Sequence, residues 1–427
     1  MKTKWIMFAA VIFSLCLKNA VLASNEQEFL WGVATSAHQI EGGDIPSDWY
    51  EFEKQGKAPD GSTTEKAVDG YNLAFEDIKL LKELGVNSYR FSIEWARVEP
   101  ENNKFDEAAL KHYHDLIVAL KNNGITPVVT LHHFTNPKWI ADKSSWTNKE
   151  TANEFVEYAR KIIDQNNNDV TYWITVNEPN VFLSYSYIFG NFPPYKKKDI
   201  LVYKKAIENV FEAHRQIYRY IHEKNNKAQV SIAYNFSDFK PKTYRLIDVL
   251  SARICNYAYS WYWTDQVKNE MDFVGINYYF SRYVGLDYPF SSQYYKYTDV
   301  SEWNQWPQNI QPEGLEHITL MAHNRYKKPI IITENGLPDK DDDKRPDFIK
   351  NHIEALNTAK SKGVEINGYF YWSLMDNFEW WGGYKDKYGL YEVDYNTMKR
   401  RPRPSAFYYR DLIMNYQKNE NLSLPTY

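Results

Sequence analysis

Two glutamates in distant parts of the sequence follow the same pattern and could act together in acid–base or nucleophilic chemistry. Glu334 comes shortly after an uninterrupted run of three isoleucines and precedes a turn at Gly336. Glu178 directly follows the apolar segment 171–177 and precedes Pro179. A lone glutamate after a strand usually starts a solvent-exposed loop. An acid at the carboxyl end of a buried parallel strand is, however, the usual position of a catalytic group in a β/α barrel. The repeated pattern therefore predicts a pair of carboxylates that face one cleft.

A carboxylate pair among polar and aromatic groups fits the hydrolysis of glycosidic bonds. One carboxylic acid protonates the leaving oxygen, and the other attacks the anomeric carbon or activates water. A separation of about 5–5.5 Å indicates a retaining enzyme and about 6.5–9.5 Å an inverting one, and the sequence does not give that distance. The chain contains 14 Trp and 35 Tyr, whose flat rings suit sugar faces, although many aromatic residues simply fill a core.

Other chemistries have little support in the sequence. No Gly-x-Ser-x-Gly elbow for a nucleophilic serine is present. His132 and His133 are adjacent in a predicted strand and point to opposite faces, so we expect no metal site and no cofactor. The net charge of −4 and the absence of a basic patch interleaved with aromatic residues predict no nucleic-acid partner.

The elements that must position these residues alternate along the chain. Apolar runs predict eight strands, over 29–34, 87–93, 126–132, 171–177, 229–235, 272–278, 328–334 and 366–373. Amphipathic patterns predict a helix after each strand, over 69–84, 106–122, 149–165, 203–223, 244–257, 312–326, 346–362 and 404–416. This α/β order predicts a single (β/α)₈ TIM barrel. An open doubly wound sheet is the alternative, but the Gly-rich phosphate turn that would favour it is absent.

If the chain forms a barrel, the residues at its mouth can be read from the strand ends. They are hydrogen-bonding, acidic and aromatic groups: Gln39, Glu41, Arg90, His132, His133, Asn177, Glu178, Asn277, Tyr278, Tyr279, Glu334, Trp372, Asp376, Asn377, Glu379 and Trp380.

The first 23 residues have the pattern of a secretory signal peptide. Lys2 and Lys4 precede an apolar run, and small residues follow at a suitable cleavage point before Ser24. We therefore expect residues 1–23 to be removed, residues 24–427 to form the catalytic domain, and the protein to be exported. We expect no membrane span after this cleavage, and Cys255 would be the one cysteine that remains.

Several motifs, in order along the chain, resemble those of family 1 glycoside hydrolases, the β-glucosidase and β-galactosidase family. The resemblance covers nearly all of residues 27–415. It lies in FLWG at 29–32 with QIEG at 39–42, YRFSI at 89–93, His133, TVNEP at 175–179, NYY at 277–279, ITENG at 332–336, and WSLMDNFEW at 372–380.

The resemblance implies a role for each matching residue. Glu334 would be the nucleophile and Glu178 the general acid and then the general base, with Arg90 and Tyr279 hydrogen-bonded to Glu334. The sugar-binding residues would be Asn177 at the 2-hydroxyl, Gln39, His133, Glu379 and Trp380 at the other hydroxyls, Trp372 under the ring, and Asn277 in the pocket wall.

The resemblance also implies the reaction: a retaining β-glycosidase, in the first place a β-glucosidase that acts on the non-reducing end of small β-D-glucosides or oligosaccharides. A β-galactosidase, β-fucosidase or β-mannosidase preference, a transglycosidase, and a non-catalytic sugar-binding barrel are the alternatives. Thioglucosidases of the family have Gln where Glu178 stands. Phospho-glycosidases have Ser and Lys where Glu379 and Asp386 stand, so we expect unphosphorylated O-glycosides as substrates.

Overall fold

The computed structural model describes residues 28–58, 61–197, 199–285 and 310–418. The predicted signal peptide, residues 1–23, lies outside these residues. In the part of the chain that the structure describes, no helix has the length and apolar character needed to cross a membrane.

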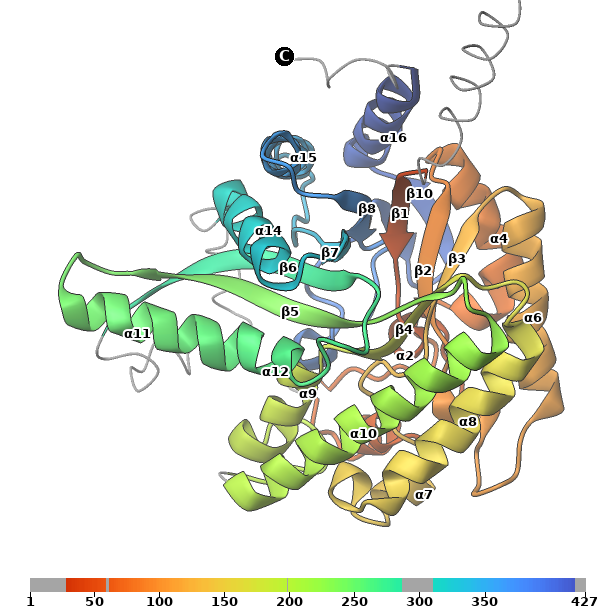
Figure 1. The fold of residues 1–427 in the computed structure, drawn as a ribbon. Helices are drawn as coiled ribbons and strands as arrows, with labels where there is room; N and C mark the ends of the chain where they lie inside the picture. The colour runs from red at the N-terminus through yellow and green to blue at the C-terminus, as the bar shows by residue number, and fades with distance from the viewer. Residues whose placement is uncertain (1–27, 59–60, 198, 286–309, 419–427) are drawn as a thin grey trace, which may run out of the picture.

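Eight strands close into one parallel barrel in the order β1 to β8 (Figure 1). Every neighbouring pair is parallel, including β1 with β8. The strands are β1 (Leu30–Ala34), β2 (Ser88–Ser92), β3 (Thr126–Thr130), β4 (Tyr172–Asn177), β5 (Gln229–Pro241), β6 (Val274–Val284), β7 (Ile330–Asn335) and β8 (Ile366–Trp372). All eight predicted strands are therefore confirmed, and with them the (β/α)₈ barrel.

The eight predicted helices are also present, with ends that differ from the prediction by at most three residues. They are α4 (Gly70–Glu83), α6 (Glu107–Asn122), α8 (Glu150–Asn166), α10 (Ile200–Lys224), α11 (Leu246–Asn256), α14 (Pro312–Tyr326), α15 (Arg345–Ser361) and α16 (Pro404–Lys418). Local signals in the sequence set their ends. The Asp106 carboxylate accepts hydrogen bonds from the backbone N–H of Ala108 and Ala109 and so begins α6.

Shorter elements lie in the connections between the strands and the long helices. They are α2 (Ala37–Ile40), α3 (Asp48–Lys54), α5 (Trp95–Val98), α7 (Lys138–Ala141), α9 (Pro179–Ser184) and α12 (Tyr262–Asp265). The antiparallel strands β9 (Tyr391–Asp394) and β10 (Lys399–Pro402) form a separate two-stranded sheet. Because α2 and α9 follow directly after β1 and β4, they lie at the carboxyl end of the barrel.

Apolar side chains fill the barrel and the layer between the barrel and its helices. Inside the barrel, Val128, Ile174, Ile331 and Phe370 belong to one buried cluster. A methyl group at Gly32 would lie only 2.4 Å from the Phe370 ring, so glycine is required where this large ring crosses β1. The packed interior makes the strand ends rigid supports for the side chains at the mouth.

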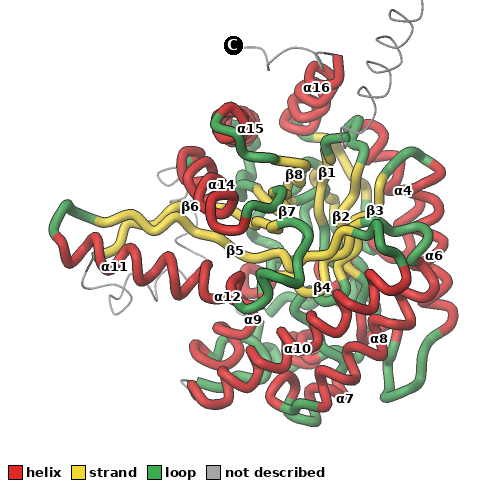
Figure 2. Tube along the Cα trace, in the orientation of Figure 1, coloured by secondary structure: helices red, strands yellow, loops and turns green. Residues whose placement is uncertain are grey.

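Strands β5 and β6 differ from the prediction because they continue beyond the barrel. They remain paired from Asp238 with Ser281 to Pro241 with Val284, after a shift of register. Helix α11 lies along this extension, and the three elements form an arm that projects from the barrel (Figures 1 and 2). The prediction ended both strands early because their outer halves contain charged and tyrosine residues in place of a continuous apolar run.

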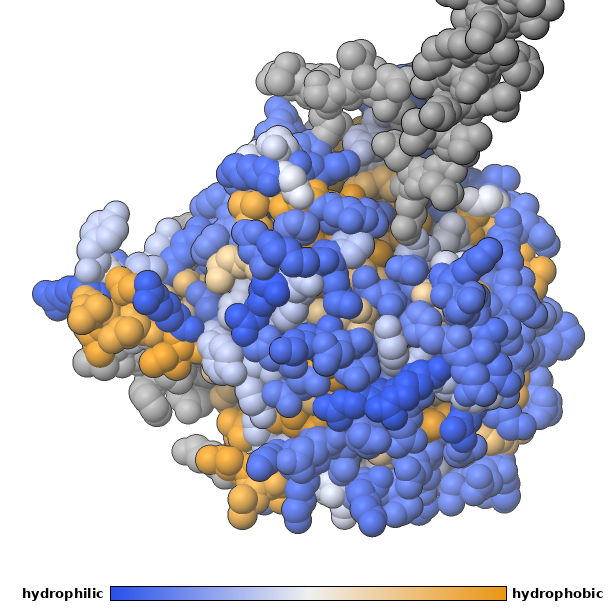
Figure 3. Space-filling view, viewed as in Figure 1, coloured by the Kyte–Doolittle hydropathy of each residue, from blue (hydrophilic) through white to orange (hydrophobic). Residues whose placement is uncertain are grey.

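The arm carries exposed apolar side chains from α11. Leu246 is 74% exposed and Ile254 67%, with Ile247 and Leu250 partly exposed beside them. Figure 3 shows apolar residues gathered at this projecting part of the molecule. The fifth predicted helix thus lies on the arm, where it contacts β5 and β6.

Candidate active site

The two glutamates singled out by the sequence are both buried at the carboxyl ends of their strands. Glu178 follows β4 and is 6% exposed, while Glu334 is the penultimate residue of β7 and is 4% exposed. The backbone of Glu178 has a left-handed φ of +42°. Residues other than glycine adopt this conformation at an energetic cost, and such strain is concentrated at functional sites.

Glu334 is held by two donors, one for each carboxylate oxygen. Arg90, from β2, donates from Nη1 to Oε1 at 2.6 Å, and Tyr279, from β6, donates its hydroxyl hydrogen to Oε2 at 2.6 Å. The Arg90 side chain is 1% exposed and that of Glu334 5%, so this is a buried ion pair. It fixes the carboxylate in one orientation.

Glu178 has different surroundings, since amide groups contact it in place of a cation. Asn235 and Asn277 donate to its Oε1 at 2.8 and 2.9 Å. Burial, followed by the negative charge of Glu334, raises the pKa of Glu178 to about 8, against the opposing effect of these two amides. Glu178 therefore holds its proton at neutral pH and can act as an acid.

Asn177 connects the surroundings of the two glutamates. Its Oδ1 accepts hydrogen bonds from Arg90 Nη2 at 2.7 Å and from Asn277 Nδ2 at 3.1 Å. Its Nδ2 lies 3.0 Å from His133 Nε2. Burial, and next the charge of Arg90, keep the pKa of His133 well below its usual value, so the imidazole is neutral and Nε2 accepts from the amide.

The remaining predicted residues form a second group that follows β1 and β8. Gln39 Nε2 donates to Glu379 Oε2 at 3.4 Å, and Trp372 Nε1 donates to Glu379 Oε1 at 3.2 Å. The His133 ring stacks near both indoles, 5.9 Å from Trp372 and 6.0 Å from Trp380 between ring centroids. His133 thus joins the two groups, and all eleven predicted site residues lie around one mouth. Their individual roles stay predictions.

Burial and the neighbouring Asp386 raise the pKa of Glu379 well above its usual value. Burial also raises the pKa of Asp386 to about 6. The raised pKa favours the neutral form of Glu379, whereas Asp386 is mostly ionised at neutral pH. The charge of Asp386 makes this side of the mouth unfavourable for an anionic substituent on a sugar.

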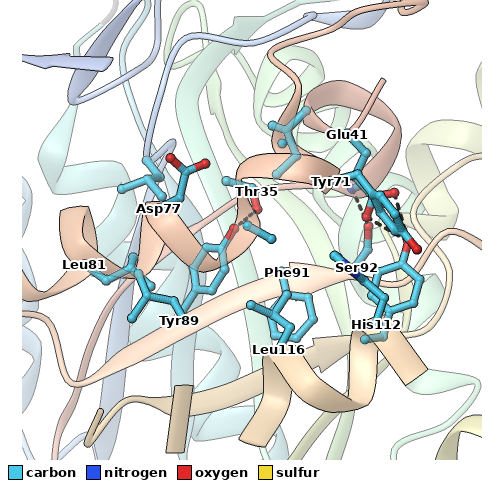
Figure 4. Close-up of a pocket in the computed structure, with 17 residues that line it drawn as sticks. Thr35, Glu41, Tyr71, Asp77, Leu81, Tyr89, Phe91, Ser92, His112 and Leu116 are labelled. Atoms are coloured by element: carbon cyan, nitrogen blue, oxygen red, sulfur yellow. Dashed lines mark hydrogen bonds between the residues drawn. The ribbon is translucent and has the colours of Figure 1, made fainter. Parts of the chain in front are cut away.

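Four residues read from the strand ends do not belong to this group. The Tyr278 hydroxyl donates to the backbone oxygen of Gln311 at 2.8 Å. Glu41 accepts from Tyr113 Oη at 2.7 Å and Arg97 Nε at 2.8 Å, and it lines a separate small cavity between β2, α4 and α6 (Figure 4). Asp376 forms a buried ion pair with Arg403 at 2.8 Å. His132, which follows β3, bonds Asn136 and lies against Trp146, away from the indoles that flank His133, as the predicted alternation requires.

Hydrogen bonds beside the cavity in Figure 4 hold the segment that carries Gln39. The Thr35 and Tyr89 hydroxyls lie 2.6 Å apart, and Ser92 Oγ accepts from the backbone N–H of Ala37 at 2.7 Å. These bonds fix both ends of the turn that leads from β1 into α2, because each joins it to β2. Gln39 is consequently fully buried with its amide directed at Glu379.

Two residues near the site were not predicted as site residues. Asn235 bonds Glu178; in the sequence it is the last residue of the predicted strand 229–235 and the first residue of an Asn-x-Ser glycosylation pattern. His38 stacks on the Trp380 ring at 5.4 Å between centroids and pairs with Glu53 at 2.8 Å. The position of Asn235 after an apolar strand run could have indicated it, whereas nothing local to His38 indicates Glu53 as its partner.

Within residues 28–58, 61–197, 199–285 and 310–418, no group of three or more His, Cys, Asp and Glu side chains is arranged to hold a metal ion. The mouth brings together two carboxyl groups, one in an ion pair and one that holds a proton.

The fold and the site together define a (β/α)₈ barrel with a buried carboxylate pair at the carboxyl ends of its strands. The model of glycosyl hydrolase family 1 matches residues 23–268 and 263–418, and the chain belongs to this family of glycoside hydrolases.

Individual relatives align with this chain over almost their whole length. The chain is 32% identical to Beta-glucosidase A of Acetivibrio thermocellus, covering 91% of this chain and 98% of that protein. It is 30% identical to a 6-phospho-beta-galactosidase of Clostridium acetobutylicum, covering 92% and 97%. The structure of the Thermotoga maritima β-glucosidase in complex with castanospermine superposes with a TM-score of 0.81 at 30% identity, covering 91% and 98%.

Proposed function

We propose that this protein is a retaining β-glycosidase, with β-glucosidase as its main activity, and that Glu334 and Glu178 carry out a double displacement. One observation carries the proposal: two buried carboxyl groups in the same mouth have opposite environments. Glu334 is paired with the Arg90 guanidinium, whereas Glu178 holds its proton. A nucleophile must be ionised and a general acid must be protonated, so the two environments suit the two roles.

In the first step, the Glu334 carboxylate attacks the anomeric carbon while Glu178 gives its proton to the leaving oxygen. A glycosyl ester of Glu334 forms, and the aglycone leaves as an alcohol. In the second step, Glu178, now a carboxylate, takes a proton from water, which attacks the anomeric carbon and releases Glu334. Two inversions give net retention of the β configuration.

The neighbouring residues support both steps. Asn177 is held by Arg90 and Asn277 beside both glutamates, where its Nδ2 can donate to the 2-hydroxyl of the sugar. Tyr279 donates to Glu334 and keeps the second oxygen of the nucleophile in place. The stacked rings of His133 and Trp372 offer a flat surface for the sugar.

We propose unphosphorylated glucosides as the substrates. The name of A. thermocellus Beta-glucosidase A supports this proposal, and so does the negative charge of Asp386 in this site. Asp386, which is mostly ionised at neutral pH, would repel a sugar phosphate. A measurable preference for 6-phospho-galactosides would contradict this part of the proposal.

The test is the initial rate on a panel of nitrophenyl β-glycosides, with Glu334→Ala and Glu178→Ala beside the unmodified protein. Loss of Glu334 should lower turnover by several orders of magnitude, and loss of Glu178 by about 10²–10⁴-fold on poor leaving groups. Azide should restore activity to both variants. With Glu334→Ala, azide attacks the substrate directly, and this single inversion should give the α-glycosyl azide. With Glu178→Ala, azide attacks the glycosyl ester of Glu334, and the two inversions should give the β-glycosyl azide.

Near-normal turnover of Glu334→Ala would refute the nucleophile assignment. Sugar binding by folded protein with no turnover of any glycoside would favour the non-catalytic alternative. Products in which an added alcohol replaces water would indicate a transglycosidase.

We also propose export, on the pattern of residues 1–23 alone. Expression of the full chain in a bacterial host and N-terminal sequencing of the mature protein should find Ser24 as the first residue. A protein that stays in the cytoplasm with Met1 intact would refute it.

A further inference from the structure

Asn235 contacts the proposed acid from the point where β5 leaves the barrel. Its Nδ2 donates to Glu178 Oε1 at 2.8 Å. An asparagine amide can donate to a carboxylate only from its nitrogen, and a half-turn of the amide would place Oδ1 there instead. Something must therefore fix the orientation of this amide.

Tyr259 supplies this constraint. Its hydroxyl donates to Asn235 Oδ1 at 2.8 Å, and a hydroxyl donor at this oxygen requires the nitrogen to face Glu178. Asn180, which is 2% exposed, binds both partners, with Nδ2 donating to the backbone oxygens of Asn235 at 2.8 Å and Tyr259 at 3.1 Å.

Tyr259 belongs to the arm and not to the barrel. It lies in the π-helical turn Tyr257–Trp261 between α11 and α12, and its ring packs against Phe239 of the outer part of β5 at 5.4 Å between centroids. A π-helical turn in a helix often accompanies a functional site. Here it carries the Tyr259 hydroxyl toward the proposed acid.

We propose that Tyr259 is a positioning residue for the glycosidase reaction: acting through Asn235, it holds an amide N–H on Glu178 and so sets how readily this acid gives up its proton. The proposal rests on the proposed function, since it takes Glu178 as the acid. It deepens that function by extending the machinery from the barrel to the arm.

The physical argument concerns the carboxylate form of Glu178. A donor on Oε1 stabilises this form, which the reaction needs when Glu178 acts as a base in the second step. Without the Tyr259 hydroxyl, the Asn235 amide is free to turn and present an oxygen to the carboxylate. The charged form would then be disfavoured, and the pKa of Glu178 would rise.

Other charged and titratable groups also face Glu178, and the test leaves them unchanged. They are Glu334 from β7, Arg90 from β2, Tyr279 from β6, Tyr388 from the segment after β8, and Tyr185 from the turn after α9.

The experiment measures kcat/KM against pH on a β-glucoside with a poor leaving group, for Tyr259→Phe, Asn235→Ala and the double variant. Loss of a hydrogen bond to a charged group shifts the pKa of that group by about one unit or more. The alkaline limb, where Glu178 loses its proton, should move up by about one unit in Asn235→Ala and by about half a unit or more in Tyr259→Phe. The double variant should match Asn235→Ala, because Tyr259 acts through that amide.

Tyr257→Phe is the matched control, since Tyr257 lies in the same turn but is 50% exposed, and its alkaline limb should stay in place. The limb on the acid side should stay in place in every variant. A merely structural loss would lower the whole profile and the unfolding midpoint without moving one limb.

Two outcomes overturn the inference: an unmoved alkaline limb in Tyr259→Phe, or shifts of the two single variants that simply add in the double variant. Failure of the proposed function is distinguishable, because Glu178→Gln would then still turn over the poor leaving group. If Glu178→Gln is inactive on that substrate and Tyr259→Phe has the unmodified profile, only the role of Tyr259 is refuted.

Discussion

Formation of the glycosyl-enzyme should itself lower the pKa of Glu178. In the free protein, burial and the Glu334 charge raise this pKa to about 8. When Glu334 becomes an ester, its charge disappears while the burial of Glu178 remains. The acid that was protonated at neutral pH should then become a carboxylate able to accept a proton from water.

The size of the change follows from Coulomb's law. At the separation of about 5.5 Å used by retaining glycosidases, and with an effective dielectric constant of about 20, one charge contributes about 3 kcal/mol. This energy corresponds to a pKa shift of about two units. The pKa of Glu178 should therefore fall from about 8 to about 6. Burial, its largest cause, prevents a return to the ordinary value of 4.5.

The ester can be trapped with a 2-deoxy-2-fluoro-glucoside that has a good leaving group, because fluorine slows the second step. Carbon-13 NMR of protein labelled at the glutamate carboxyl groups, with Glu178→Gln to assign the signal, gives the pKa before and after trapping. In the free protein, kcat/KM should also fall above about pH 8 as Glu178 loses its proton. A change of less than half a unit on trapping would show that the Glu334 charge does not control the acid, and would refute this reasoning.

Three further substitutions have definite expected outcomes. Tyr279→Phe removes a hydrogen bond to the proposed nucleophile and should lower kcat about 10- to 100-fold with an unchanged unfolding midpoint; an unchanged kcat would contradict its role. Glu53→Gln leaves the buried imidazolium of His38 without its partner and should reduce the free energy of unfolding by about 3–5 kcal/mol in urea at pH 5.5. Burial lowers the pKa of His38, but the charge and hydrogen bond of Glu53, together with the charges of Glu94 and Asp48, outweigh burial and raise this pKa. The difference in unfolding free energy should therefore narrow as pH rises through that pKa, and a constant difference would count against the prediction. Gly336→Ala would bring a methyl group within 1.9 Å of a backbone oxygen at the end of β8, so the unfolding midpoint and the activity should both fall; full activity would show that the strand ends can separate without cost.

Local patterns in the sequence determined the barrel. Each strand is a short apolar run, each covering helix has one apolar face, and both patterns can be read without knowing what they pack against. The positions of Glu178 and Glu334 at strand ends were equally local, and closure of the barrel brought them to one mouth. The family motifs added the remaining site residues, since their order along the chain matches the order of the strands.

Only the tertiary structure decided which polar residues serve the site. Glu41 and Glu379 both follow barrel strands. Glu41 nevertheless accepts a hydrogen bond from Arg97 outside the mouth, whereas Glu379 accepts one from the Trp372 indole within it. Asn235 became a partner of Glu178 because β4 and β5 are neighbours. These outcomes depend on which side chain meets an opposite charge or an open hydrogen-bonding atom after packing.

The arm and the raised pKa of Glu178 likewise could not be predicted from the sequence. The outer halves of β5 and β6 form strands because each is the other's partner, despite a weak apolar pattern. The pKa of Glu178 depends on burial and on a charge more than a hundred residues away along the chain. The sequence thus determined the elements and the residue types at their ends, whereas contacts between distant segments set the chemistry of each carboxyl group, because solvation and Coulomb energies depend on distance in space.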